Sequence, residues 1–155
     1  MAEQLEVTVE STDQQVRCAG VSRSNTAITM DYYPPLGTGQ GYTGLELLLM
    51  SLATCSVTTM VFLLRKMGKN ISGFKVNAKG IRRDRHPTSL EKIYLTFTVH
   101  SGDAQGPDLQ KAIKLSEETY CPVWAMLKNN VEVVTEYTII PETAMRTQIK
   151  SDKRG

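Results

Sequence analysis

Two of the three cysteines lie in sequence settings that favour thiol chemistry. Cys55 lies well inside a long apolar segment, residues 44–57, that predicts a buried helix. Cys121 precedes Pro122, and because proline suits the first position of a helix, Cys121 is the expected N-cap. There its sulfur would face unpaired backbone N–H groups and the positive end of the helix dipole, which lowers a thiol pKa. If the fold brings the two thiols together, they form a dithiol that can give two electrons to an oxidant.

Each cysteine also has a purely structural interpretation. Cys55 can be a small buried hydrophobe, and Pro122 can break a helix with Cys121 in an incidental place. Cys18 lies in a predicted strand beside Arg17. No other cysteine stands at a spacing from it that is typical of a redox or metal-binding motif, so we interpret it as structural. The helix that holds Cys55 carries a stripe of small polar side chains at i, i+3, i+4 and i+7, which predicts close packing on another element: Ser51, Thr54, Cys55 and Thr58.

The composition indicates a soluble globular protein in a reducing compartment. The chain has 155 residues, of which 41% are hydrophobic and 22% charged. A net charge of +2 with 6% aromatic residues argues against a nucleic-acid partner. Three cysteines behind a polar N-terminus predict free thiols and a cytoplasmic location. We expect no cofactor and no metal, because there is no Cys-x-x-Cys motif and His86 and His100 are scattered.

Two other patterns are weaker than they look. The run from Gly39 to Gly44 matches a dinucleotide-binding glycine motif, but Pro34-Pro35 interrupts the strand that should precede it, and no acid lies about 20 positions further on. The segment from Leu45 to Leu64 has about the length that spans a bilayer. Its Glu46 and its polar stripe instead predict the core helix of a soluble protein, with no membrane partner.

The order of the predicted elements is three strands, a helix, two strands, two helices and a strand, which is an α+β domain. We expect one domain over residues 1–142 and a disordered polar tail over 143–155. Two strands are expected to pair as an antiparallel hairpin, 74–81 and 93–100. The other strands are predicted over 5–10, 15–21, 27–32 and 131–139, and the helices over 44–67, 108–120 and 122–128.

Taken together, the two cysteine segments resemble the OsmC/Ohr family of hydroperoxide-resistance proteins, and most closely its YhfA-like branch. The resemblance covers about residues 1–141. It is carried by Glu46 to Cys55, by Leu115 to Leu127, by Arg82-Arg83 with Pro87 ahead of the strand at Ile93, and by Tyr137. It implies antiparallel sheets with two-strand and three-strand units around a long central helix, in an intertwined homodimer.

The resemblance also implies an activity, namely the thiol-dependent reduction of organic hydroperoxides. By position, Cys55 is the attacking thiol and Cys121 the resolving thiol, and an external dithiol is the reductant. The peroxidase branches carry Asn-Pro-Glu before the first helix, where this chain has Thr43-Gly44-Leu45. Glu46 comes one position later and faces about 100° away on a helix.

The sequence does not identify which arginine would activate the thiol. Arg17 is the nearest candidate for the family's N-terminal arginine, and Arg82 or Arg83 could act from another direction. Two alternatives therefore stay open beside the peroxidase. One is a non-catalytic dimer that binds a small apolar ligand or senses redox state, and the other is a stress-associated dimer with inert cysteines. A basic cluster is formed in a predicted loop by Arg82, Arg83, Arg85 and His86. It is either a solvated turn, a group that lowers the pKa of a nearby thiol, or a holder of an anionic substrate.

Overall fold

The computed structural model describes residues 3–142, and the polar tail at 143–155 lies outside the described residues. The chain divides into two compact units, Met1–Leu48 and Leu49–Gly155. The boundary falls inside the long helix α1 (Gly44–Lys66). The single domain expected over 1–142 stays a prediction.

The first unit is built on a small antiparallel sheet. Its strands β1 (Thr8–Ser11), β2 (Cys18–Val21) and β3 (Ile28–Met30) pair in the order β1-β2-β3. Alternation predicted longer strands at all three places, but the ladder breaks where the chain turns at Thr12 and Ser22. Apolar side chains on this sheet stay exposed, among them Val9 and Ile28.

Helix α1 begins at the predicted residue and ends one residue before the predicted end. Thr43 precedes its first turn, and Gly68 follows its last turn with φ at 80°, a conformation that glycine adopts without a steric penalty. Within the described residues it is the one helix long and apolar enough to cross a membrane, by length and composition alone. Core helices of soluble proteins pass the same test, and Leu52, Met60 and Leu64 are wholly buried against their own chain.

The second unit holds a larger sheet of the order β4-β5-β6. Strands β4 (Gly73–Arg82) and β5 (Leu90–His100) form the predicted antiparallel hairpin. Strand β6 (Glu132–Ile140) pairs with β5 in parallel, so the expectation of purely antiparallel two-strand and three-strand units needs correction. The reason is the helical connection between β5 and β6, because a crossover of this length returns the chain in the same direction.

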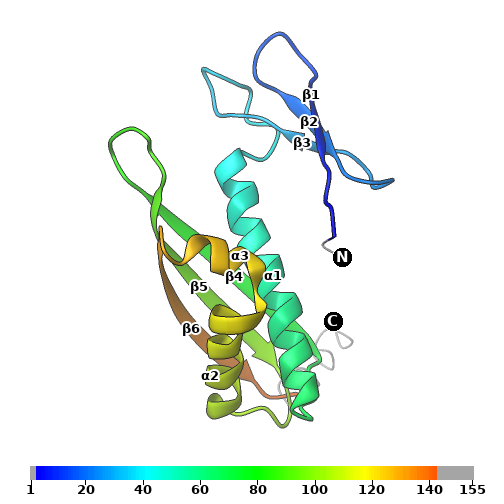
Figure 1. Ribbon diagram of the computed structural model, residues 1–155, viewed down its shortest axis with the longest axis vertical. Helices are drawn as coiled ribbons and strands as arrows, with labels where there is room; N and C mark the ends of the chain where they lie inside the picture. Colours follow the sequence, from blue (N-terminus) through cyan, green and yellow to red (C-terminus); the bar gives the residue numbers. More distant parts are fainter. Residues whose placement is uncertain (1–2, 143–155) are drawn as a thin grey trace, which may run out of the picture. The chain divides into compact units, whose positions relative to one another are not determined.

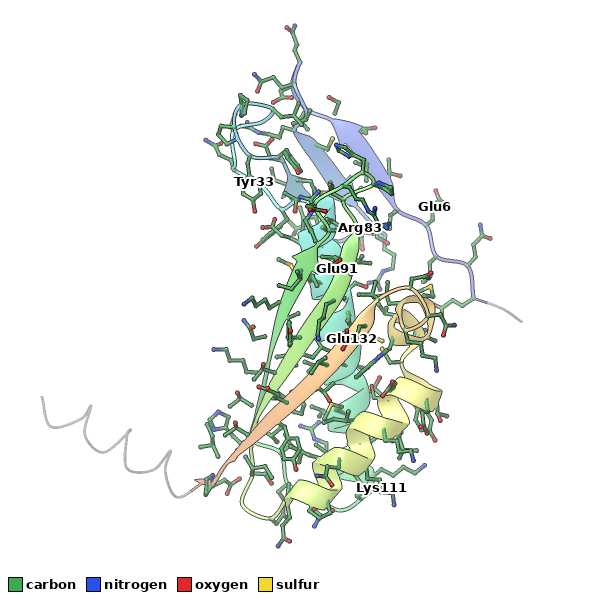
Figure 2. The ribbon with its side chains drawn as sticks, turned by 90° about the vertical axis from the view of Figure 1, so that its left-hand side faces the viewer. Glu6, Tyr33, Arg83, Glu91, Lys111 and Glu132 are labelled. Carbon is green, nitrogen blue, oxygen red and sulfur yellow. The ribbon has the colours of Figure 1, made fainter. Side chains whose placement is uncertain are left out.

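The helices of the second unit cover one face of its sheet (Figures 1 and 2). Alternate residues of β5 face them and are buried: Ile93, Leu95, Phe97 and Val99. Helix α2 (Gly106–Leu115) buries Leu109, and the short helix α3 (Pro122–Leu127) buries Trp124. Because each element presents one apolar face, the core lies between the sheet and the helices.

The helix predicted over 108–120 is divided in the structure. Regular α-helix ends at Leu115, and a wider π-helical turn, η1 (Ser116–Tyr120), follows it. The turn closes where the N–H of Cys121 donates to the carbonyl of Ser116 at 2.9 Å. Proline at 122 disfavours the α conformation at Cys121, which has φ at −89° and ψ at 106°, so the helix cannot continue. Turns of this kind occur often at functional sites.

Candidate active site

The two predicted cysteines face each other in the second unit. Cys121 donates its S–H to the sulfur of Cys55, with the two sulfur atoms 2.8 Å apart. Both are free thiols. Cys55 lies midway along α1 and is half-buried, whereas Cys121 is only 2% exposed. A disulfide bond is about 2.05 Å long, so an oxidant that removes two electrons and two protons could join the two sulfurs with only a small movement.

Residues before and after Cys121 in the sequence fix its position. It is the N-cap of α3, as predicted, and its sulfur accepts a hydrogen bond from the backbone N–H of Trp124 at 3.4 Å. Its own N–H closes the π-helical turn on Ser116. The turn before it and the helix after it therefore fix the direction of its side chain toward α1.

The electrostatics at Cys121 are the reverse of what the helix start predicted. Burial is the main cause that raises the pKa of Cys121 to about 11, and its hydrogen bond to Cys55 raises it further. Backbone N–H groups of Trp124 and Val123 act in the opposite direction and are outweighed. The predicted thiolate at Cys121 is therefore wrong, because tertiary burial outweighs the local cap.

Cys55 lies beside a face of α1 that the other described residues leave open. Three members of the polar stripe are exposed: Ser51, Thr54 and Thr58. The same side carries Met50, which is 43% exposed, and Phe62, which is 57% exposed. Met50, Thr54, Thr58 and Phe62 recur at intervals of four, so they form one continuous helical face. Large apolar side chains at such exposure indicate a surface that another element covers.

Glu46 has a structural partner that the sequence analysis missed. Its carboxylate accepts the N–H of Thr43 at 2.7 Å, while its own N–H donates to the Thr43 hydroxyl at 3.3 Å. This is a capping box, and Thr-x-x-Glu before an apolar run is its sequence signal. The hydroxyl of Tyr33 donates to the second carboxylate oxygen at 2.7 Å. These bonds, with that from Thr43 the largest, lower the pKa of Glu46.

Arg17 belongs to a polar cluster in the first unit. Its guanidinium donates to the Thr38 hydroxyl at 2.6 Å and to the Gln40 side-chain oxygen at 3.3 Å, and it lies 3.7 Å from the carboxylate of Asp31. Asp31 is buried and accepts the backbone N–H groups of Tyr32, Thr38 and Gln40. The Thr38 hydroxyl is the main cause that holds the pKa of Asp31 far below its usual range.

Asp31 was not among the predicted site residues. An acid directly after a strand and before Pro34-Pro35 is a common turn organiser, and that signal could have found it.

Arg82 and Arg83 lie on the hairpin between β4 and β5 and bond to residues of the same hairpin. Arg82 donates to the carbonyl of Thr88 at 2.8 Å and also to its hydroxyl, and Arg83 donates to the Ser89 hydroxyl at 2.8 Å. Both side chains are exposed. Over residues 3–142, no group of three or more His, Cys, Asp or Glu side chains is placed to hold a metal ion.

The chain is similar to known proteins in sequence and in structure. A family model described as OsmC-like protein matches residues 37–136. Protein YhfA of Escherichia coli (strain K12) is 29% identical over 96 residues, which are 62% of this chain and 72% of YhfA. The crystal structure of a hypothetical protein from Aquifex aeolicus VF5 matches with a TM-score of 0.78 and 29% identity, over 90% of this chain and 98% of that chain.

A further match is the crystal structure of an organic hydroperoxide resistance protein from Elizabethkingia anophelis. It has a TM-score of 0.71 at 14% identity, over 90% of this chain and 99% of that chain. At that identity the likeness is one of fold. The matches confirm the predicted family resemblance and the OsmC-like α+β fold.

Proposed function

We propose that this chain, which belongs to the OsmC family of OsmC-like proteins, reduces organic hydroperoxides with the thiols of Cys55 and Cys121. The observation that carries the proposal is the contact of 2.8 Å between the two sulfur atoms. Some structural neighbours are named organic hydroperoxide resistance proteins, which agrees with this chemistry.

The environments of the two sulfurs support different roles for them. Cys121 is buried and its pKa is raised to about 11, so it is protonated at neutral pH and is a poor nucleophile. Cys55 is half-buried and receives the S–H of Cys121, a hydrogen bond that a thiolate would accept well. We therefore assign the attack on peroxide to Cys55 and the resolving step to Cys121.

The reaction has three balanced steps. The Cys55 thiolate attacks the distal oxygen of the hydroperoxide, the O–O bond breaks, and the products are a sulfenic acid and an alkoxide that takes up a proton. The sulfur of Cys121 then attacks the sulfenic sulfur, forms the disulfide, and water leaves. An external dithiol reduces the disulfide by exchange and becomes oxidised itself.

A homodimer is part of the proposal, because a second copy would cover the open face of α1 around Met50 and Phe62. The exposed apolar side chains of the first unit, such as Val9 and Ile28, would gain the same protection. Light scattering should give a mass near twice the 17.2 kDa of the chain. A mass near 17.2 kDa would refute the dimer.

The second candidate function is a non-catalytic dimer that binds a small apolar ligand or senses redox state. It is favoured by the contacts of the two groups that would assist a peroxidase. Both carboxylate oxygens of Glu46 are engaged by Thr43 and Tyr33, and Arg17 is bound to the polar cluster around Asp31. A sensor would form the disulfide once and would not turn over rapidly with a dithiol.

Cumene hydroperoxide consumption in the presence of excess dithiothreitol separates the candidates. We expect repeated turnover by the wild type, loss of consumption in Cys55→Ser, and slower turnover in Cys121→Ser, where dithiothreitol must attack the sulfenic acid of Cys55 directly and over-oxidation of Cys55 competes with that step. Cys18→Ser is the matched control, because that cysteine lies outside the pair and should not affect the rate. If neither variant of the pair changes the rate, the proposal fails.

A further inference from the structure

The hairpin between β4 and β5 carries basic residues that the thiol chemistry does not use. Beside it lies a hollow of about 640 Å³, within the range of small-molecule sites. Its lining includes Arg83, Arg85 and Ser89 from the hairpin and Asn130 from the turn after α3. Leu90, which is buried, also lines it.

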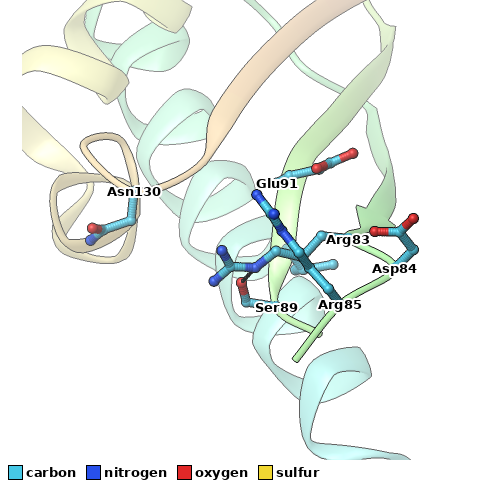
Figure 3. A pocket seen from close by; sticks show the side chains of 7 residues that line it. Arg83, Asp84, Arg85, Ser89, Glu91 and Asn130 are labelled. Atoms are coloured by element: carbon cyan, nitrogen blue, oxygen red, sulfur yellow. Dashed lines mark hydrogen bonds between the residues drawn. The ribbon is translucent and has the colours of Figure 1, made fainter. Parts of the chain in front are cut away.

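The charges around the hollow are separated in space. Figure 3 shows the guanidinium groups of Arg83 and Arg85 extending toward the side on which Asn130 lies, while the carboxylates of Asp84 and Glu91 point the other way. In the described part of the chain, neither arginine takes part in an ion pair. Two cations that share one side of a hollow repel each other, and an anion between them would relieve that repulsion.

The Arg83 guanidinium, a hydrogen-bond donor of the hollow, is held in a fixed orientation before any ligand binds. The Nε–H of Arg83 donates to the Ser89 hydroxyl oxygen at 2.8 Å, which holds the guanidinium in place and leaves its Nη groups for a ligand. Asn130 also lines the hollow, on the side toward which the guanidinium groups extend, with its amide turned away from them in Figure 3. Guanidinium groups match the oxygen atoms of phosphate in pairs, and a doubly charged phosphate suits two of them.

We propose that this hollow binds a small hydrophilic molecule through a phosphate monoester group. None of the residues that line it is aromatic, so it offers no stacking surface for a nucleobase, and its volume exceeds the need of a bare ion. A sugar phosphate is the class that fits this combination. The site is separate from the cysteine pair and does not depend on the proposed peroxidase activity.

The test is a titration of the full-length protein with glucose 6-phosphate at low salt, followed by the Arg Nε–Hε signals in proton–nitrogen NMR spectra. We expect saturable shifts at Arg83 and Arg85, and no shift with glucose at the same concentrations. Removing one guanidinium in Arg83→Gln or Arg85→Gln should weaken binding about tenfold, the usual effect of one charge-assisted contact. Inorganic phosphate should compete, which distinguishes the phosphate group from the sugar as the anchor.

Two further variants keep the result interpretable. Lys79→Gln removes an exposed positive charge from β4, the strand that leads into the hairpin, but not from the hollow, and should change the affinity less than twofold. Arg83→Lys keeps the charge and should bind better than Arg83→Gln. Equal losses in Lys79→Gln and Arg83→Gln, shifts that do not saturate, or equal binding of glucose would each overturn the site.

Discussion

The assignment of roles to the two sulfurs predicts a large and pH-dependent difference between their single-cysteine variants. At pH 7 a thiol with a pKa of about 11 is roughly 10⁻⁴ thiolate, whereas an unperturbed thiol near 8.5 is roughly 3% thiolate. That difference is about 300-fold in the reactive species. A more basic thiolate is also more nucleophilic, which restores about tenfold, so Cys121 alone should react about 30-fold more slowly than an ordinary thiol.

The assay uses a Cys18→Ser background, so that only the pair can react, and follows one turnover of cumene hydroperoxide from pH 6 to 9. In Cys55→Ser the serine hydroxyl can still accept from Cys121, and burial, the largest cause of the raised pKa, remains. We expect its slow rate to rise about tenfold per pH unit over this range, because the thiolate fraction does. A rate that levels off near pH 8, or that lies within threefold of the rate of Cys121→Ser, would refute the reasoning.

Three further predictions concern stability, measured by urea unfolding. Thr43→Ala should remove the N-cap of α1 and cost about 1 kcal/mol, whereas Thr43→Ser should keep most of that stability. Leu64→Ala should cost about 3 to 5 kcal/mol, because this side chain is 0% exposed. Asp31 has a depressed pKa when folded, so its contribution to stability is present above its usual pKa of about 4 and is lost as the pH falls below that value. Asp31→Asn should therefore unfold at lower urea at pH 7 and lose less stability on acidification than wild type, whereas the exposed Asp84→Asn should match the wild type.

Much of the fold could be predicted because local signals and tertiary structure agree there. Helix α1 runs from Gly44 to Lys66, one residue short of the prediction, because its helical pattern begins at Gly44 and Gly68 marks its C-terminal end. Strict alternation likewise identified β4 and β5 and their antiparallel pairing. These are contacts between neighbours in the sequence, which patterns of period 2 and 3.6 describe well.

The features that were mispredicted depend on residues far apart in the sequence. The parallel pairing of β6 with β5 follows from where the intervening helices pack, which periodicity does not record. The π-helical turn at Ser116–Tyr120 keeps a helical residue pattern, so only the position of Pro122 hints that the helix ends before Cys121. Arg17 illustrates the same limit, since its partner Asp31 lies directly after β3, beyond the turn that joins β2 to β3.

The cysteine pair shows how a correct local prediction can lead to a wrong chemical one. The sequence predicted the N-cap at Cys121, and Trp124 does donate to its sulfur. Yet the free energy of a charge depends on all that surrounds it, and burial with a second thiol 2.8 Å away outweighs two backbone N–H groups. The raised pKa that results makes Cys121 a hydrogen-bond donor in the resting state rather than the thiol that attacks the peroxide. The same contact that disfavours a thiolate at Cys121 therefore supplies Cys55 with a hydrogen bond, so one piece of geometry divides two chemically identical side chains into attacking and resolving roles.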